Sequence, residues 1–148
     1  QAAQALGVNW KDACEGFVSD GRVGLSHLDV PGHDGFYGFG EAYFSIVEHG
    51  SVKAWKRHRR MTLNLIVPHG SIQFVIHDDR DDSKTKGLFE SIKISRDNYY
   101  RLSIPPMLWL GFKGCSQGQN ILLNIASIPH DPNEADNMDE SEIDYNWE

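Results

Sequence analysis

The segment Gly50-Ser-Val-Lys-Ala-Trp-Lys-Arg-His58 is the most informative part of this chain. It starts at a glycine, and its residues from Val52 onward are predicted to form a β-strand. Side chains two residues apart on a strand point to the same side. Lys56 and His58 are therefore expected to face the same side of their strand, toward the interior of the protein.

Short predicted strands continue beyond this segment. Each is rich in β-branched, aromatic or other apolar residues, and each ends near a glycine, a proline or a polar turn. They cover residues 41–48, 52–58, 61–67, 72–77, 88–94, 100–104, 108–112 and 120–126. Short strands at intervals of roughly ten residues, without a long amphipathic helix after residue 40, predict a sandwich or barrel.

The spacing of residues 50–70 indicates which kind of sandwich or barrel this is. It matches G-x5-H-x-H-x4-E-x6-G, the first cupin motif, and residues 105–110 are similar to the second motif, P-x-G-x-x-H. The resemblance implies an all-β fold, a cupin-type double-sheet (jelly-roll) barrel. The positions that hold metal ligands in such motifs are occupied here by Lys56, His58, Leu63 and Leu110. Because one imidazole is too few ligands for a divalent metal, and a protonated lysine repels one, we expect no metal and no cofactor.

Landmarks along the chain resemble one group of cupins. They are Phe39-x-Glu41, Gly50-x-Val-Lys53, Asp78-x-Arg80-x-x-Ser83-x-Thr85-x-Gly87-x-Phe89, Ile104-Pro105-Pro106 with Gly111-Phe112, Asp131-Pro132, and Ile143-x-Tyr145-x-Trp147. In order and spacing, residues 38–147 resemble the dTDP-4-dehydrorhamnose 3,5-epimerases and the related sugar-nucleotide ketoisomerases. The resemblance implies a metal-free homodimer whose substrate is a nucleotide-diphosphate sugar. The implied reaction removes a proton next to the ketone of a 4-keto-6-deoxyhexose and returns one to the opposite face.

Several catalytic positions of that family hold other residues here. The resemblance places the epimerase base on Lys56 and the epimerase acid, a tyrosine, on Asn124. The family's enolate-supporting lysine falls near Leu63, and its second pocket histidine falls on Leu110. The ketoisomerases use a His-x-His pair, of which His58 is the second member. Two hypotheses follow: an epimerase or isomerase of deoxysugar or surface-polysaccharide biosynthesis that uses Lys56 and His58, or a non-catalytic cupin that binds a sugar nucleotide.

Lys56 and His58 are the candidate catalytic residues, and their individual roles stay open. Lys56 is a candidate base, a candidate cation for an enolate oxygen, or a structural partner of a phosphate or of Glu41. His58 is a candidate base with Lys56 as the electrophile, or else a hydrogen-bonded interior histidine. Candidate substrate-binding residues have an inward-facing strand position or a positive charge suited to a diphosphate. They are Glu41, Tyr43, Lys53, Arg57, Arg60, Arg80 and Asn124.

The distribution of charge points to a small anionic partner. The chain has 148 residues and a formal net charge of −7. Eight of the 21 acidic residues lie from Asp131 onward, where there is no lysine or arginine, so the rest of the chain is close to neutral. A near-neutral body with one cluster of cations, residues 53–60, suits a small anion rather than a nucleic acid.

Three segments are expected along the chain. Residues 1–37 are predicted to be an arm or edge strands, residues 38–130 the cupin barrel, and residues 131–148 an acidic C-terminal segment. In the resembled family the N-terminal segment lends a strand to a dimer partner. No apolar run is long enough to cross a membrane. Cys14 and Cys115 form no disulfide framework, which is typical of a reducing compartment, so we expect a cytoplasmic protein with no membrane partner.

Overall fold

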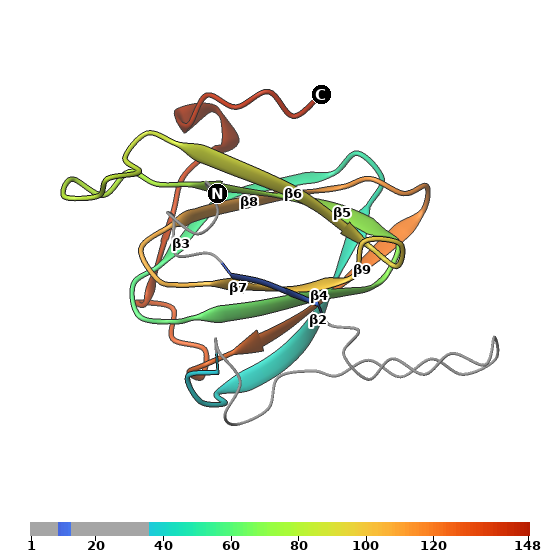
Figure 1. Ribbon diagram of the computed structural model, residues 1–148, viewed down its shortest axis with the longest axis horizontal. Coiled ribbons are helices and arrows are strands. Elements are labelled where there is room, and N and C mark those ends of the chain that lie inside the picture. Colours follow the sequence, from blue (N-terminus) through green and yellow to red (C-terminus); the bar gives the residue numbers. More distant parts are fainter. Residues whose placement is uncertain (1–8, 13–35) are drawn as a thin grey trace.

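Two five-stranded antiparallel sheets pack face to face in the computed structural model, which describes residues 9–12 and 36–148 (Figure 1). One sheet has the order β1-β7-β4-β9-β2 and the other β10-β3-β8-β5-β6. The elements are β1 (Asn9–Asp12), β2 (Glu41–Glu48), β3 (Val52–His58), β4 (Leu63–His69), β5 (Ser71–His77), β6 (Phe89–Ser95), β7 (Tyr100–Ile104), β8 (Trp109–Gly114), β9 (Gln119–Ala126), β10 (Ala135–Asn137) and the 3-10 helix η1 (Glu140–Glu142). This architecture confirms the predicted all-β cupin-type double-sheet barrel.

The core lies between the sheets and uses alternate residues of the strands. Ile72, Phe74 and Ile76 of β5 have no exposed surface, and they belong to one cluster with Leu65 and Val67 of β4. Burial of side chains of this size stabilises the fold by about 1.5–3 kcal/mol each. The alternation that predicted the strands is therefore the alternation that fills the core.

All the predicted strands are present, and their ends agree with the prediction to within two residues. The strand β4 is displaced at both ends: residues 61–67 are predicted, and the strand runs from Leu63 to His69. The backbone N–H of Met61 donates to Glu134 Oε1 at 2.8 Å, and that of Thr62 donates to Ser127 Oγ at 2.9 Å. Because side chains occupy these two amides, regular strand pairing starts only after them.

The acidic C-terminal segment packs against the second sheet, above β3, β8, β5 and β6 in Figure 1. Its strand β10 pairs with β3, and Trp147 is buried in a cluster with Trp55 and Trp109. At the other end of the chain, β1 is an edge strand beside β7. The expected arm for a dimer partner lies outside the described residues, apart from β1 and residues 36–37.

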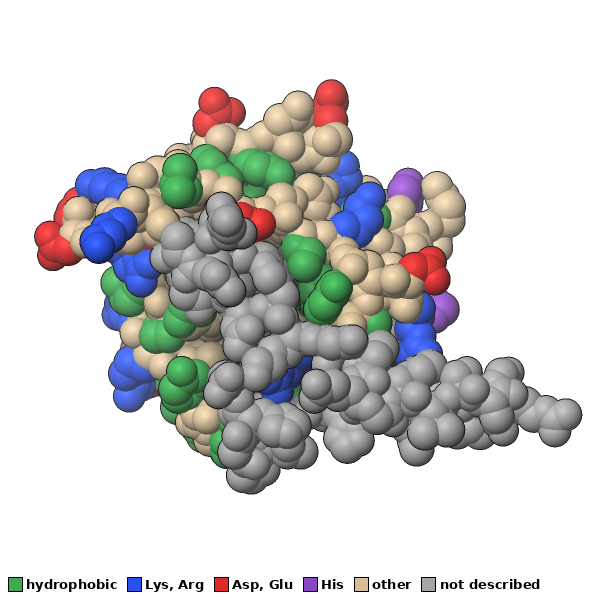
Figure 2. Space-filling model, viewed as in Figure 1, with side chains coloured by type: hydrophobic (Ala, Val, Ile, Leu, Met, Phe, Trp, Pro, Cys, Tyr) green, Lys and Arg blue, Asp and Glu red, His purple; other side chains and the backbone are tan. Residues whose placement is uncertain are grey.

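A buried aspartate holds the loop that joins β5 to β6. Asp78 accepts hydrogen bonds from Arg80 Nε at 2.9 Å and from the hydroxyls of Ser83 and Thr85, both at 2.6 Å. The Arg80 side chain is the main reason that the pKa of Asp78 lies well below its usual range, and the hydroxyls add to it against the opposing effect of burial. The loop projects from the molecule and carries acidic and basic side chains together (Figure 2).

Gly111 on β8 gives Trp147 room to dock. A Cβ at position 111 would lie 2.8 Å from Trp147 ring carbons and 2.9 Å from Ala54 Cβ. We expect Gly111→Ala to lower the free energy of unfolding by about 1–3 kcal/mol, measured by urea denaturation. In a Trp147→Ala background the same change is expected to cost much less. Equal costs in both backgrounds would show that the clash with Trp147 is not the cause.

Candidate active site

A cavity of about 450 Å³ opens between the two sheets. One wall comes from β2, β4 and β9, and the other comes from β3 and β8 with residues from β10 onward at its edge. Its polar lining includes Tyr43, Lys53, Lys56, His58 and Asn124, all of them predicted site residues. The volume is in the usual range of small-molecule sites.

A buried carboxylate orients His58. His58 Nδ1 lies 2.6 Å from Glu134 Oε2, and the two residues are 9% and 3% exposed. The other carboxylate oxygen of Glu134 accepts the backbone N–H groups of Arg60 at 2.6 Å and Met61 at 2.8 Å. With both oxygens occupied, Glu134 is fixed, and it fixes the imidazole in turn.

Glu134 is ionised over a wide pH range. Burial alone would raise its pKa, but the hydrogen bond from His58, the two backbone N–H groups and the His58 charge outweigh burial and lower the pKa to about 2. A carboxylate can only accept hydrogen bonds. His58 Nδ1 must therefore carry a hydrogen and donate it to Glu134, whether or not Nε2 also carries a hydrogen.

With Nδ1 bound to Glu134, the other ring nitrogen of His58, Nε2, is available to a ligand in the cavity. His58 lines the cavity, and among the described residues Nε2 has no hydrogen-bond partner. When Nδ1 holds the hydrogen of a neutral imidazole, Nε2 carries a lone pair. The cavity is thus equipped with an oriented base, an arrangement typical of general base catalysis.

The cations of residues 53–60 divide into two groups. Arg57 and Arg59 pair with Asp136, and Arg60 lies 3.5 Å from Asp131. Lys53 and Lys56 line the cavity, and within residues 9–12 and 36–148 neither has an acidic partner. The two lysines are therefore the cations of this segment that are available to an anion in the cavity.

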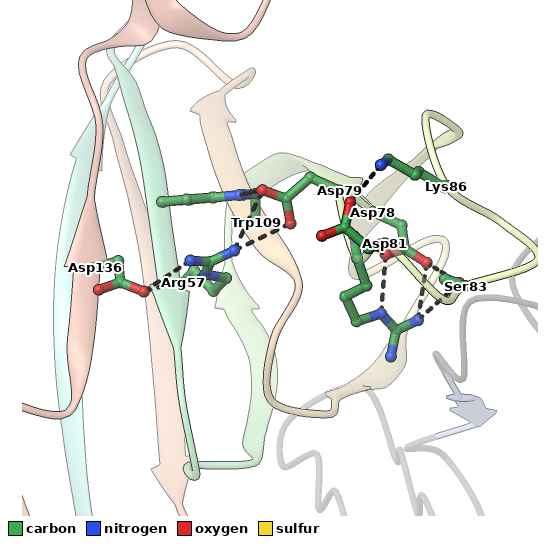
Figure 3. A network of polar contacts seen from close by, with 9 residues as sticks. Arg57, Asp78, Asp79, Asp81, Ser83, Lys86, Trp109 and Asp136 are labelled. Atoms are coloured by element: carbon green, nitrogen blue, oxygen red, sulfur yellow. Dashed lines mark hydrogen bonds and ion pairs between the residues drawn. The ribbon is translucent and has the colours of Figure 1, made fainter.

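Arg57 lies on the opposite side of β3 from His58, in the network of Figure 3. Its guanidinium stacks on Trp109 at 4.5 Å and donates to Asp79 at 3.0 Å and to Asp136 at 3.0 Å. Trp109 Nε1 also donates to Asp79, at 2.8 Å. Arg57 therefore connects the β5–β6 loop with β10, and the structure does not bring it into the cavity.

The remaining predicted site residues are placed differently. Tyr43 and Asn124 face the cavity from β2 and β9, where they are cross-strand partners. Glu41 is half-buried at the start of β2 and does not line the cavity. Arg60 and Arg80 also lie outside it, paired with acidic residues. A role in substrate binding for these three residues and Arg57 stays a prediction.

Leucines line the cavity where metal-binding cupins place ligands. Leu63 and Leu110 are both among its wall residues. In the described part of the chain, no group of three or more His, Cys, Asp or Glu side chains lies together as metal ligands would. The same residues contain no helix long and apolar enough to span a membrane.

Glu134 is the site residue that sequence reasoning did not find. It follows the landmark Asp131-Pro132 in a stretch with eight acidic residues and no basic ones, which is typical of a solvated tail. Its partner His58 lies 76 positions earlier. One signal was available: an acidic segment and a strongly basic strand in one chain are expected to attract each other.

Asp136 is expected to support the site indirectly. It holds Arg57 and Arg59 and lies two residues after Glu134 on the chain. Loss of these ion pairs in Asp136→Asn is expected to loosen β10 and slow the reaction proposed below by about tenfold, because small misplacements of catalytic groups are costly. The control is Asp81→Asn, since Asp81 is an exposed partner of Lys86. Equal rates for wild type and Asp136→Asn would contradict this expectation.

No family model matches the chain. The crystal structure of a dTDP sugar isomerase from Desulfovibrio desulfuricans G20 is 33% identical and superposes with a TM-score of 0.88, covering 95% of this chain and 90% of that one. A protein of Haloferax volcanii named "Probable low-salt glycan biosynthesis epimerase" is 32% identical over 105 residues, which are 70% of this chain and 65% of the relative. The chain thus matches less than two thirds of that relative's length.

A more distant structure agrees in fold. The dTDP-4-dehydrorhamnose 3,5-epimerase of Sulfolobus tokodaii is 19% identical, with a TM-score of 0.74 over 93% of this chain and 85% of that one. At this identity the likeness concerns the fold alone. The match to the Desulfovibrio isomerase, by contrast, has one third identical residues over nearly the full length of both chains. The chain therefore belongs to the cupin-fold family of the dTDP-4-dehydrorhamnose 3,5-epimerases and related sugar-nucleotide isomerases.

Proposed function

We propose that this protein is a metal-free epimerase or isomerase of a nucleotide-linked 4-keto-6-deoxy sugar. The observation that carries the proposal is the cavity-facing His58, oriented by the buried Glu134, with Lys56 two residues away on the same wall. The name of the Desulfovibrio relative supports a dTDP sugar as substrate. The name of the Haloferax relative supports a place in surface glycan biosynthesis.

The proposed reaction begins with proton abstraction. His58 Nε2 takes a proton from the carbon next to the ketone, and the electron pair of that C–H bond forms an enolate. The negative charge gathers on the ketone oxygen, where the Lys56 ammonium stabilises it. Return of a proton to carbon completes the reaction, so no cofactor is consumed.

Lys53 is proposed to bind the diphosphate of the substrate. It lines the same cavity and is exposed, and no described acidic residue neutralises it. Phosphate oxygens accept strong charge-assisted hydrogen bonds from such ammonium groups. The nucleotide would then lie toward the open side of the cavity, with the sugar ring between the two walls.

A homodimer and a cytoplasmic location are part of the proposal. Phe44 and Ile46 on the outward side of β2 are 67% and 53% exposed, and β2 is an edge strand of its sheet. Exposed apolar side chains on an edge are typical of a surface that a second copy covers. Cys115 is a free thiol, which fits a reducing compartment.

The test is deuterium exchange in D2O. The protein is incubated with dTDP-4-keto-6-deoxyglucose, and deuterium at carbons 3 and 5 is followed by NMR. We expect deuterium to enter at one or both of these carbons. Binding of the sugar nucleotide without exchange at either carbon would favour the non-catalytic binding cupin instead.

A further inference from the structure

A hydrogen-bonded pair faces His58 from the other side of the cavity. Tyr43 of β2 and Asn124 of β9 are direct cross-strand partners, and Asn124 Nδ2 donates to Tyr43 Oη at 2.9 Å. Both side chains line the cavity. They belong to the sheet β1-β7-β4-β9-β2, whereas His58 belongs to β3 in the opposite sheet. A substrate bound between the sheets would have His58 on one face and Tyr43 on the other.

Tyr43 is the strongest acid on its wall. The described side chains that line the cavity from β2, β4 and β9 are Tyr43, Ser45, Leu63, Leu65, Leu122 and Asn124. A phenol is a far stronger acid than an aliphatic hydroxyl or a carboxamide, and leucine has no exchangeable proton. If a proton reaches the substrate from this wall, Tyr43 is the group that can supply it.

Asn124 controls where the Tyr43 proton points. Because the Tyr43 oxygen already accepts a hydrogen from Asn124 Nδ2, its own O–H is left to donate elsewhere. The same N–H stabilises the phenolate after the proton has left. Asn124 is 3% exposed, and its Oδ1 has no hydrogen-bond partner among the described residues, so it is an acceptor reserved for a ligand such as a sugar hydroxyl.

We propose that Tyr43 is the catalytic acid of this protein, that Asn124 is its positioning residue, and that the reaction is therefore an epimerisation. The inference rests on the proposed function. His58 Nε2 removes the proton on one face of the carbon, and the Tyr43 O–H bond breaks as a new C–H bond forms on the opposite face. Tyr43 is 42% exposed, so water can return a proton to the phenolate, and His58 releases its extra proton to solvent.

The experiment separates exchange from inversion. Wild type, Tyr43→Phe and the control Tyr37→Phe are incubated with dTDP-4-keto-6-deoxyglucose in D2O, and NMR follows deuterium in the recovered substrate and in the inverted product. Tyr37 is 72% exposed and does not line the cavity. In Tyr43→Phe we expect inversion to fall about 100-fold or more. Deuterium should still enter the substrate with retained configuration, because His58 can return a solvent deuteron to the face it serves.

Asn124→Asp provides a second variant that keeps the phenol. A carboxylate only accepts hydrogen bonds, so it would bind the Tyr43 proton and withdraw it from the substrate. Inversion is expected to fall as in Tyr43→Phe, while exchange with retention persists and dTDP still binds by calorimetry.

The outcomes are distinct. Wild-type rates of inversion in Tyr43→Phe, or exchange in the wild type without any inverted product, would overturn the role of Tyr43 and leave the proposed function intact. No exchange in the wild type would instead overturn the proposed function.

Discussion

His58→Asn is expected to lower deuterium exchange and product formation by about 1,000-fold or more. The asparagine amide has no basic nitrogen, so no group in the place of His58 Nε2 can accept the carbon-bound proton. General bases of this kind commonly contribute factors of 10²–10⁴, and here exchange and product formation both depend on the first proton transfer. The measurement is the initial rate of deuterium entry by NMR in D2O.

The control for this variant is His130→Asn. His130 is exposed, follows β9 and does not line the cavity. The asparagine NH2 group can still donate to Glu134, but it does not fill the space of the buried imidazole ring, which is expected to cost about 1–3 kcal/mol of stability. Urea denaturation therefore accompanies the rate measurement, so that only folded protein is compared.

Lys56 provides the contrasting result. Lys56 is the proposed stabiliser of the enolate oxygen. We expect Lys56→Met to slow deuterium exchange less than the loss of the base in His58→Asn does. If His58→Asn kept most of the wild-type rate while Lys56→Met lost it, Lys56 would be the base, in agreement with its match to the base position of the epimerases. The geometry favours His58, because Glu134 orients its ring.

Strand periodicity predicted much of the fold and the shared orientation of Lys56 and His58. The alternation along Val52–His58 placed Lys56 and His58 on one side, and both line the cavity. The same alternation places Arg57 on the other side of the strand from Lys56 and His58. The cations of residues 53–60 nevertheless form one cluster in the sequence, because they are close along the chain. Lys53 has the opposite parity to Lys56 and still lines the cavity, because the register of β3 against β8 shifts between these two residues. A local shift of this kind leaves no trace in hydrophobic alternation.

Contacts between distant segments could not be predicted in the same way. The pairing of β10 with β3 and the hydrogen bond between His58 and Glu134 each join segments more than seventy positions apart. From composition, residues 131–148 could be described only as acidic. A run of acidic residues has the same composition whether it is exposed to solvent or packed against a basic strand. The bond from Asn124 to Tyr43 is likewise a matter of cross-strand register, which strand boundaries alone do not fix.

Glu134→Gln is expected to lower the exchange rate on the order of 1,000-fold while keeping the fold, as replacement of the carboxylate in other carboxylate–histidine pairs does. The carbonyl oxygen of the glutamine can still accept the N–H groups of Arg60 and Met61. Its NH2 group then faces His58 Nδ1, which must accept rather than donate. The imidazole hydrogen moves to Nε2, and the base is lost from the cavity.

The acid stability of this variant gives an independent readout. The folded-state pKa of Glu134 is about 2, below its ordinary value of 4.5, so ionised Glu134 stabilises the folded protein above pH 4.5 and this contribution is lost as the pH falls toward 2. The difference corresponds to about 3 kcal/mol. Glutamine does not titrate, so the stability advantage of the wild type over Glu134→Gln should shrink by about this amount between about pH 7 and pH 2.

Urea denaturation of both proteins across this range measures the difference. The other acidic residues titrate equally in both proteins and cancel, because the variant changes one carboxyl group only. A gap that stays constant with pH would mean that Glu134 is not held as the ionised partner of His58. In that event the slow exchange of Glu134→Gln could not be attributed to a reversed imidazole, and the case for His58 as the base would depend on His58→Asn alone.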